Sequence, residues 1–142
     1  MWKDLGEYIE NLANSHPNNK NKIVEIAIGK FFEVSNYLKE NNNIELILTD
    51  INPDKTYNSI NNTNKIIKDD ITNPNLEIYK NTKLIYSIRP QYELQEHIIS
   101  LAEQLNVTLI IKPLFNDDLY NKNKFKLKNY KTAIFYIMNE KN

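Results

Sequence analysis

The 142-residue sequence contains no cysteine, two glycines and a single arginine. Without cysteine there are no disulfides, no thiolate catalysis and none of the usual structural zinc sites. The two histidines, His16 and His97, are far apart and lack the spacing of metal ligands. We therefore expect a protein that holds no metal ion.

The sequence also lacks an excess of charge of either sign, because 18 Lys and Arg residues balance 18 Asp and Glu residues. Net charge thus gives no indication of a nucleic-acid or membrane-surface partner. No apolar run approaches the length of a membrane span, and the N-terminal segment is too polar for a signal peptide. These absences predict a cytoplasmic protein.

What the chain does contain is typical of a globular domain. Its hydrophobic fraction is 41% and its aromatic fraction is 11%, and its length fits a single domain over residues 1–142. The 24 asparagines cluster in short gaps between apolar runs. We interpret these clusters as loops rather than as a prion-like tract.

Short β-branched runs alternate with helical patterns along the chain. A helix is expected in residues 1–15, followed by five β/α units over residues 22–112. A further strand in residues 125–139 follows no crossover helix, so we expect it to be antiparallel. The pattern predicts an α/β fold, namely a Rossmann-like, doubly wound and mostly parallel sheet with helices on both faces. The five parallel strands are expected at residues 23–28, 44–50, 65–70, 83–88 and 107–113.

Ligand-competent residues stand where these strands end, and in such a sheet the ligand lies outside the carboxyl ends of the strands. Gly29 ends the first strand, where a missing side chain lets a ligand approach the backbone. Asp50 ends the second and can accept hydrogen bonds from ribose hydroxyls, and Asp69 or Asp70 after the third can accept from an adenine amino group. The structural alternatives are a tight turn at Gly29, a cap or turn at Asp50, and a solvated turn at Asp69 and Asp70.

Three further candidates lie on the first and fourth strands. Glu25 lies inside the first strand, where a carboxylate is costly unless it is paired, so it braces the turn or faces a ligand amine. Ser87, near the end of the fourth strand, is a candidate cofactor-binding residue. Arg89 is the only arginine, and its planar guanidinium suits a clamp on a carboxylate or phosphate of the substrate or cofactor. The alternative for Arg89 is an ion pair with Asp69, Asp70 or Glu93. His97, within a helix, is interpreted as a helix residue rather than a catalytic one.

With these residues in place, residues 20–140 resemble the core of a class I S-adenosylmethionine-dependent methyltransferase. The stretch EIAIGKF, from Glu25 to Phe31, resembles the acidic, glycine-rich first motif of that superfamily. The resemblance implies a ribose-binding role for Asp50 and an adenine-side role for Asp70. More narrowly, the stretches IAIGKFFEV, TDI, DDIT and YSIRPQYELQ resemble a small archaeal family of uncharacterised Rossmann-like proteins.

The sequence departs from the superfamily pattern in three ways. Ala27 and Phe31 replace glycines of the first motif, and Phe31 is expected to crowd the methionine part of a cofactor. The fourth strand ends in Ser-Ile-Arg-Pro instead of the Asn/Asp-Pro-Pro-aromatic motif of amino-group methyltransferases. No separate substrate domain is expected.

Two functions remain open on these grounds. The first is a minimal methyltransferase with S-adenosylmethionine as its cofactor, since methyl transfer needs mainly alignment. The second is a non-catalytic nucleotide-binding or interaction module that acts with a partner subunit or as a homo-oligomer. Both readings predict a nucleoside-type ligand. A nicotinamide dinucleotide is disfavoured because the G-x-G-x-x-G fingerprint is absent.

Overall fold

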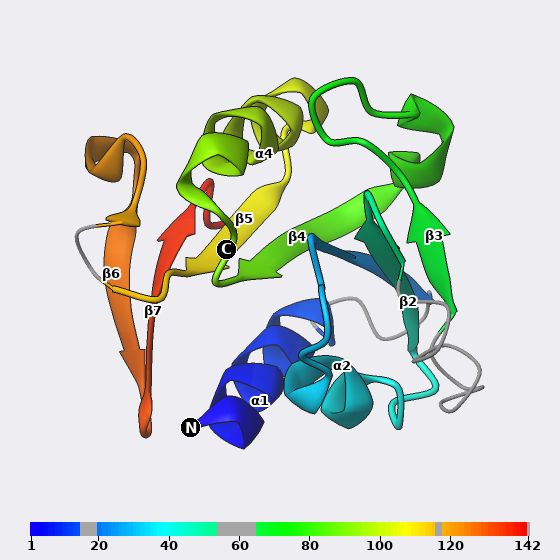
Figure 1. Cartoon of the computed structure of the whole chain (residues 1–142). Coiled ribbons are helices and arrows are strands. Elements are labelled where there is room, and N and C mark those ends of the chain that lie inside the picture. Colours follow the sequence, from blue (N-terminus) through cyan, green and yellow to red (C-terminus); the bar gives the residue numbers. More distant parts are fainter. Residues whose placement is uncertain (15–19, 54–64, 116–117, 142) are drawn as a thin grey trace.

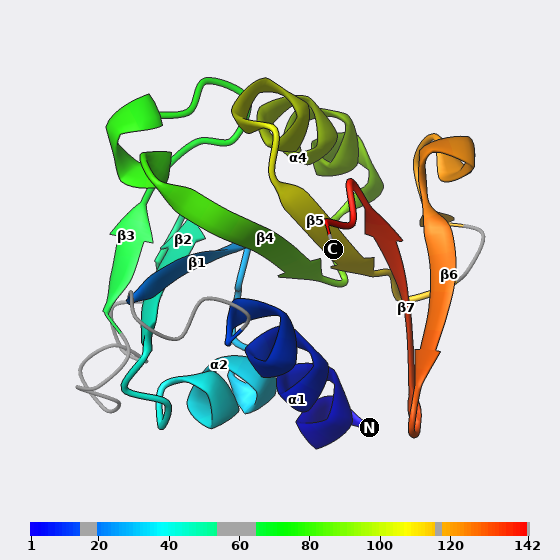
Figure 2. The same cartoon turned by 180° about the vertical axis from the view of Figure 1, so that it is seen from behind.

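The computed structural model describes residues 1–14, 20–53, 65–115 and 118–141, and in them the chain forms a seven-stranded sheet flanked by helices (Figures 1 and 2). The strands lie in the order β3-β2-β1-β4-β5-β7-β6. Strands β1 to β5 are parallel, whereas β7 is antiparallel to β5 and β6 is antiparallel to β7. Their bounds are β1 Asn21–Ile26, β2 Ile44–Asp50, β3 Ile66–Lys68, β4 Thr82–Ile88, β5 Thr108–Lys112, β6 Lys126–Tyr130 and β7 Ala133–Met138.

This architecture confirms the predicted mostly parallel α/β sheet with an antiparallel strand at its C-terminal end. β6 was not predicted as a separate strand. Its sequence, KLKNY, is polar and largely exposed, because β6 is the outermost strand and pairs only with β7. Lysine-rich edge strands of this kind are typical of sheets that avoid pairing with other chains, but they lack the apolar run by which buried strands are found in a sequence.

Helices cover both faces of the sheet, as predicted (Figures 1 and 2). Helices α1 (Trp2–Ala13) and α2 (Glu33–Leu38) lie on one face, and α4 (Tyr92–Leu105) lies on the other. Short 3-10 helices η1 (Leu76–Tyr79) and η3 (Lys122–Lys124) complete the described elements. Because strand side chains alternate between faces, each central strand contributes to both cores. The core beneath α1 and α2 contains Leu5, Ile9, Ile23, Val34, Leu38, Leu84, Tyr86 and Ile110, whereas the core beneath α4 contains Val24, Ile26, Ile85, Ile98, Leu101, Leu109 and Ile111.

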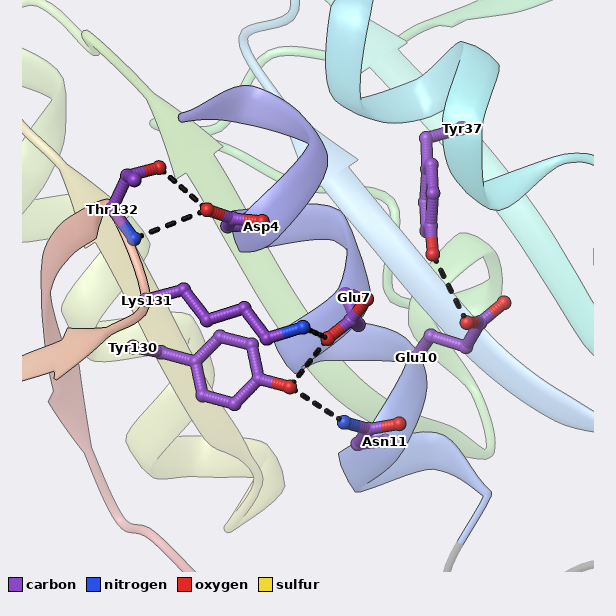
Figure 3. Close-up of polar contacts among 8 residues, drawn as sticks. All are labelled: Asp4, Glu7, Glu10, Asn11, Tyr37, Tyr130, Lys131 and Thr132. Atoms are coloured by element: carbon purple, nitrogen blue, oxygen red, sulfur yellow. Dashed lines mark hydrogen bonds and ion pairs between the residues drawn. The ribbon is translucent and has the colours of Figure 1, made fainter.

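Polar contacts tie α1 to the turn between β6 and β7 (Figure 3). The Asp4 carboxylate accepts hydrogen bonds from the backbone N–H and the hydroxyl of Thr132. The Glu7 carboxylate accepts from the Tyr130 hydroxyl and pairs with the Lys131 ammonium. These contacts join the first helix to the last hairpin, 120 residues or more along the chain, and thereby fix α1 across the sheet.

In the part of the chain that the structure describes, no helix is long and apolar enough to cross a membrane.

Candidate functional site

A crevice of about 280 Å³ lies at the carboxyl ends of β1, β2, β3 and β4. The chain proceeds outward from β1 to β2 on one side and from β4 to β5 on the other, so the strand order reverses between β1 and β4. This is the point at which open parallel sheets bind ligands. The wall carries apolar groups and polar groups together, as ligand sites do. It is formed by Ile26, Ala27, Gly29, Thr49, Asp50, Ile51, Asp69, Asp70, Ile71, Arg89, Pro90, Gln91 and Leu94.

The turn after β1 and the end of β2 are joined through the Asp50 carboxylate. Its Oδ2 accepts a hydrogen bond from the Gly29 backbone N–H at 2.8 Å, and its Oδ1 accepts one from the Asn52 N–H at 3.0 Å. Asp50 therefore stabilises the turn after β1 and the turn that follows β2, in agreement with the turn-forming role that was the alternative to ligand binding. A carboxylate has about four acceptor sites, so two remain for ligand hydroxyls. Gly29 itself has φ +58°, and a Cβ built there would meet no atom within 4 Å, so its lack of a side chain leaves the crevice open.

Asp69 and Asp70 line the same crevice but differ in how their oxygens are used. Both Asp69 oxygens are occupied within the protein, one by the Asn75 N–H at 2.9 Å and the other by the Tyr79 hydroxyl at 2.5 Å. Asp70 uses only Oδ1, which accepts from the hydroxyl and the N–H of Thr72. These two hydrogen bonds lower the pKa of Asp70, so the group is a carboxylate at neutral pH. The Oδ2 atom of Asp70 accepts no hydrogen bond from the described residues, which makes it the more available of these two acids.

Glu25 and Ser87 do not line the crevice. Glu25 is 1% exposed and faces the core beneath α1 and α2, where it lies opposite Tyr86 on β4. Burial raises the pKa of Glu25 to about 8, and the nearby Tyr86 hydroxyl offsets only part of that rise. The geometry falls short of a hydrogen bond, since neither Glu25 oxygen has a partner in the described structure. Ser87 is fully buried and donates its hydroxyl hydrogen to the Ile26 carbonyl at 2.6 Å. Strand alternation places both side chains in the protein interior, which the pattern of strand ends did not distinguish.

Arg89 lines the crevice, yet its guanidinium carbon lies over the rings of Trp2 and Phe31, 5.1 and 5.4 Å from their centroids. Neither aromatic residue lines the crevice, so the side chain is directed toward α1. The expected alternative, an ion pair with a nearby aspartate or Glu93, is absent: Arg89 forms no ion pair with any described residue. Phe31, which was expected to crowd the methionine part of a cofactor, does not line this crevice, and its ring packs edge-on against Trp2 at 4.7 Å.

The sequence did not indicate Trp2 as part of this region. Trp2 belongs to an N-terminal helix that packs on the sheet and contacts the β6–β7 turn, far along the chain, and nothing in the local pattern encodes such contacts. Lys112, within the fifth strand that was expected at residues 107–113, was not a candidate site residue. The sequence did contain a signal for it, because the fifth strand was expected to end at the same edge of the sheet as the fourth, which Arg89 follows. In the structure the Arg89 N–H donates to the Lys112 carbonyl at 2.6 Å.

A second cavity, of about 310 Å³, lies at the opposite edge of the sheet, near the amino ends of β1, β4 and β5. Although it is slightly larger, it has no carboxylate in its wall and lies away from the edge where parallel sheets bind ligands. We therefore place the candidate site at the carboxyl edge. No group of three metal-ligating side chains occurs among the described residues. His97, on α4, is 3.9 Å from Glu96, and His16 lies outside the described residues.

The fold is that of a methyltransferase domain. The chain is similar to human methyltransferase 10 domain containing protein, with a TM-score of 0.65 at 11% identity over 94% of this chain and 78% of the other. It is also similar to the N-terminal domain of human METTL16 in complex with SAH, with a TM-score of 0.58 at 11% identity over 92% and 66% of the two chains. A third similar structure is Streptomyces venezuelae DesVI, with a TM-score of 0.58 at 11% identity over 91% and 58%. At these identities the likeness shows the fold alone.

Sequence comparison gives the family. Residues 4–140 match the uncharacterised protein family UPF0146, and the chain belongs to this family. A UPF0146 protein of Methanothermobacter thermautotrophicus is 39% identical over 136 residues, which cover 96% of this chain and 93% of the relative. One of Methanocaldococcus jannaschii is 42% identical over 135 residues, which cover 95% and 94%. These archaeal relatives agree with the narrower resemblance that the four sequence stretches indicated.

Proposed function

We propose that this protein binds a nucleoside of the S-adenosylmethionine type in the crevice at the carboxyl ends of β1 to β4. The observation that carries the proposal is the shared wall formed by Gly29, Asp50 and Asp70 at the point where the strand order reverses. Asp50 would accept hydrogen bonds from the ribose hydroxyls with its two remaining acceptor sites. Asp70 would accept from the adenine amino group with Oδ2. The apolar wall, including Ile71 and Leu94, would contact the base.

The comparisons support a ligand of this kind. The METTL16 domain with the same fold is solved in complex with SAH, and MtNAS, similar over 95% of this chain with a TM-score of 0.54, is solved in complex with MTA and tNA. If the protein is an enzyme, it is a minimal methyltransferase in which the cofactor supplies the methyl group. The residues of the chain would then hold and orient the nucleoside and exclude water around it.

A non-catalytic binding module is the second candidate, favoured by the end of β4. Amino-group methyltransferases place an Asn/Asp-Pro-Pro-aromatic motif there, whereas this chain has Arg89 with its side chain turned toward Trp2 and Phe31. In that case the protein binds the nucleoside without transferring a methyl group by itself, and a partner subunit supplies the missing substrate site. The two candidates differ in whether the purified protein, incubated with S-adenosylmethionine and a heat-inactivated cell extract, yields S-adenosylhomocysteine.

Ligand binding is tested by titration calorimetry with S-adenosylmethionine, S-adenosylhomocysteine, NAD and ATP. We expect the first two to bind and NAD not to bind. Asp50→Ala is expected to weaken nucleoside binding by about 1–3 kcal/mol, the cost of leaving polar groups unpaired. Glu45→Ala is the matched control, because Glu45 is exposed at the other end of the same strand. If the Asp50 and Glu45 variants bound the nucleoside with equal affinity, the proposal that it binds in this crevice would be contradicted.

A further inference from the structure

Arg89 holds a guanidinium group at the carboxyl edge of the sheet, beside two aromatic rings. The faces of the Trp2 and Phe31 rings lie within cation–π distance of it, at 5.1 and 5.4 Å. The residue is exposed, and its side chain makes no hydrogen bond with any described residue. These ring contacts hold the side chain without using its N–H donors, which form a fork that matches a carboxylate or phosphate.

Lys112 brings a second cation to the same place. It is the register partner of Ile88, the residue before Arg89, and strand alternation puts it on the face that Ile110 shares with α1. Partial burial lowers the pKa of Lys112, and the positive charge of Arg89 lowers it further. The two groups therefore repel each other at a site that is partly shielded from water.

No acid compensates this repulsion among the described residues. Elsewhere among the described residues, three lysines are paired with carboxylates: Lys124 with Glu103, Lys128 with Glu140 and Lys131 with Glu7. Arg89 and Lys112 form no such pair in the described part of the chain. Two adjacent cations without a counter-charge raise the free energy of the empty protein, and an anion placed between them would lower it.

The pair extends beyond the nucleoside crevice. Lys112, Trp2 and Phe31 are absent from its wall, and only Arg89 is common to both regions. We propose that Arg89 and Lys112 form an oxyanion-binding subsite on the α1 side of the crevice, which takes a carboxylate or a phosphate. Arg89 binds the anion through two parallel N–H donors while its guanidinium rests on Trp2 and Phe31, and Lys112 supplies the second charge.

The anion can come from two ligands. The choice between these two ligands rests on the proposed function, whereas the subsite itself does not. One is the amino-acid carboxylate of an S-adenosylmethionine-type ligand, whose nucleoside fills the adjoining crevice. The other is the acidic group of a second ligand, which on the methyltransferase reading is the methyl acceptor. The subsite itself needs neither ligand to be identified, because inorganic phosphate and acetate carry the same chemistry.

The chain provides its own reporter for this subsite, since Trp2 is its only tryptophan and lies against Arg89. We would titrate the full chain with inorganic phosphate or acetate at constant ionic strength and follow the tryptophan fluorescence. We expect a saturable change. Lys112→Gln should weaken the response about tenfold or more, the effect of losing a charged partner. Lys83→Gln, which alters an exposed lysine at the other end of β4, should leave it unchanged.

Arg89→Lys provides a second variant that keeps the charge. We expect it to bind the anion as weakly as Lys112→Gln, because an ammonium offers no planar fork. If neither anion gives a saturable change, or if Lys112→Gln responds like the unchanged protein, Arg89 serves only to hold α1 on the sheet and the subsite does not exist.

The source of the anion is then read from competition with S-adenosylhomocysteine. If S-adenosylhomocysteine displaces phosphate, the subsite takes the carboxylate of the nucleoside ligand. If both bind together, it takes a second ligand. Asp50→Ala separates the two proposals, because it should lose the nucleoside and retain the phosphate response. A protein that binds phosphate but no nucleoside would overturn the proposed function and leave the subsite standing.

Discussion

Glu25 places an ionisable group in the interior of the protein, between two central strands. Its carboxyl group is in the core beneath α1 and α2, and burial raises its pKa to about 8 from 4.5. Burial disfavours the charged carboxylate, and the Tyr86 hydroxyl opposite it stabilises the charge too weakly to reverse the rise in pKa. At neutral pH the folded protein therefore holds Glu25 protonated, whereas the unfolded chain has it ionised.

This difference predicts the pH dependence of stability. Because the folded-state pKa is the higher one, the contribution of Glu25 is fully present below about pH 4.5 and is lost as the pH rises toward 8. The loss amounts to about 1.4 kcal/mol per pH unit in that window. Glu25→Gln replaces the titrating carboxyl group with an amide that does not titrate. The free energy of unfolding of this variant should therefore fall much less between pH 5 and pH 8. Urea unfolding at several pH values measures this, with the exposed Glu45→Gln as the control. Parallel pH profiles for the Glu25 variant and the unchanged protein would contradict the assignment.

At the scale of single residues, the sequence predicted those side chains whose position follows from a strand end. Gly29, Asp50, Asp69 and Asp70 lie together in the crevice because parallel strands bring their carboxyl ends to one edge. Glu25 was placed in the site on its position in a motif, but alternation along β1 turns it into the opposite core. A strand pattern alone does not say which face of a two-sided core receives a given side chain.

At the scale of elements, α1 and α2 pack closely, and Gly6 allows their approach. A Cβ at Gly6 would lie 2.6 Å from the Tyr37 ring, closer than such atoms come in folded proteins. The Tyr37 hydroxyl donates to the Glu10 carboxylate at 3.3 Å, which holds the ring in place (Figure 3). The ring therefore has little freedom to yield.

Gly6→Ala should accordingly destabilise the protein by about 1–3 kcal/mol through overpacking, even though alanine is the better helix former by about 1 kcal/mol. The melting temperature, measured by thermal unfolding, shows whether the substitution stabilises or destabilises the protein. In a Tyr37→Ala background the Cγ and ring atoms that a Cβ at Gly6 would meet are absent, so the same substitution should become neutral or stabilising. A stabilising Gly6→Ala in the unchanged protein would mean that the helices separate without cost.

The same scale shows which elements a sequence can specify. β1, β4 and β5 carry continuous buried apolar runs, as strands covered on both faces do, and these were found in the sequence. α2 occupies only Glu33–Leu38, because the turn after β1 extends to Phe32. β6 carried no signal, since an exposed edge strand needs no apolar run.

At the scale of the whole molecule, α1 is held by two kinds of interaction. Its apolar face buries Leu5 and Ile9 completely in the core shared with α2 and the sheet. Its polar face joins the β6–β7 turn through Asp4 and Glu7, and hydrogen bonds from that turn lower the pKa of both carboxyl groups. The polar contribution is thus present at neutral pH and is lost as the pH falls through these lowered values. Since both carboxyl groups are exposed to solvent, we expect apolar burial to contribute more to the attachment of α1.

Two substitutions in α1 test this ranking. Leu5→Ala removes a side chain that is 0% exposed and should cost about 2–5 kcal/mol, from lost burial and from the cavity left behind. Glu7→Gln removes only a half-buried charge, which weakens the contact with Lys131 but leaves the apolar face intact. It should lower the melting temperature far less than Leu5→Ala does, and the difference between it and the unchanged protein should vanish at low pH. Lys3→Ala, an exposed position on the same helix, should have almost no effect. Differential scanning calorimetry of the three variants gives the order of their melting temperatures. If Glu7→Gln proved as damaging as Leu5→Ala, the polar contacts with the last hairpin, rather than the core, would hold α1 and hence Trp2 in position beside Arg89.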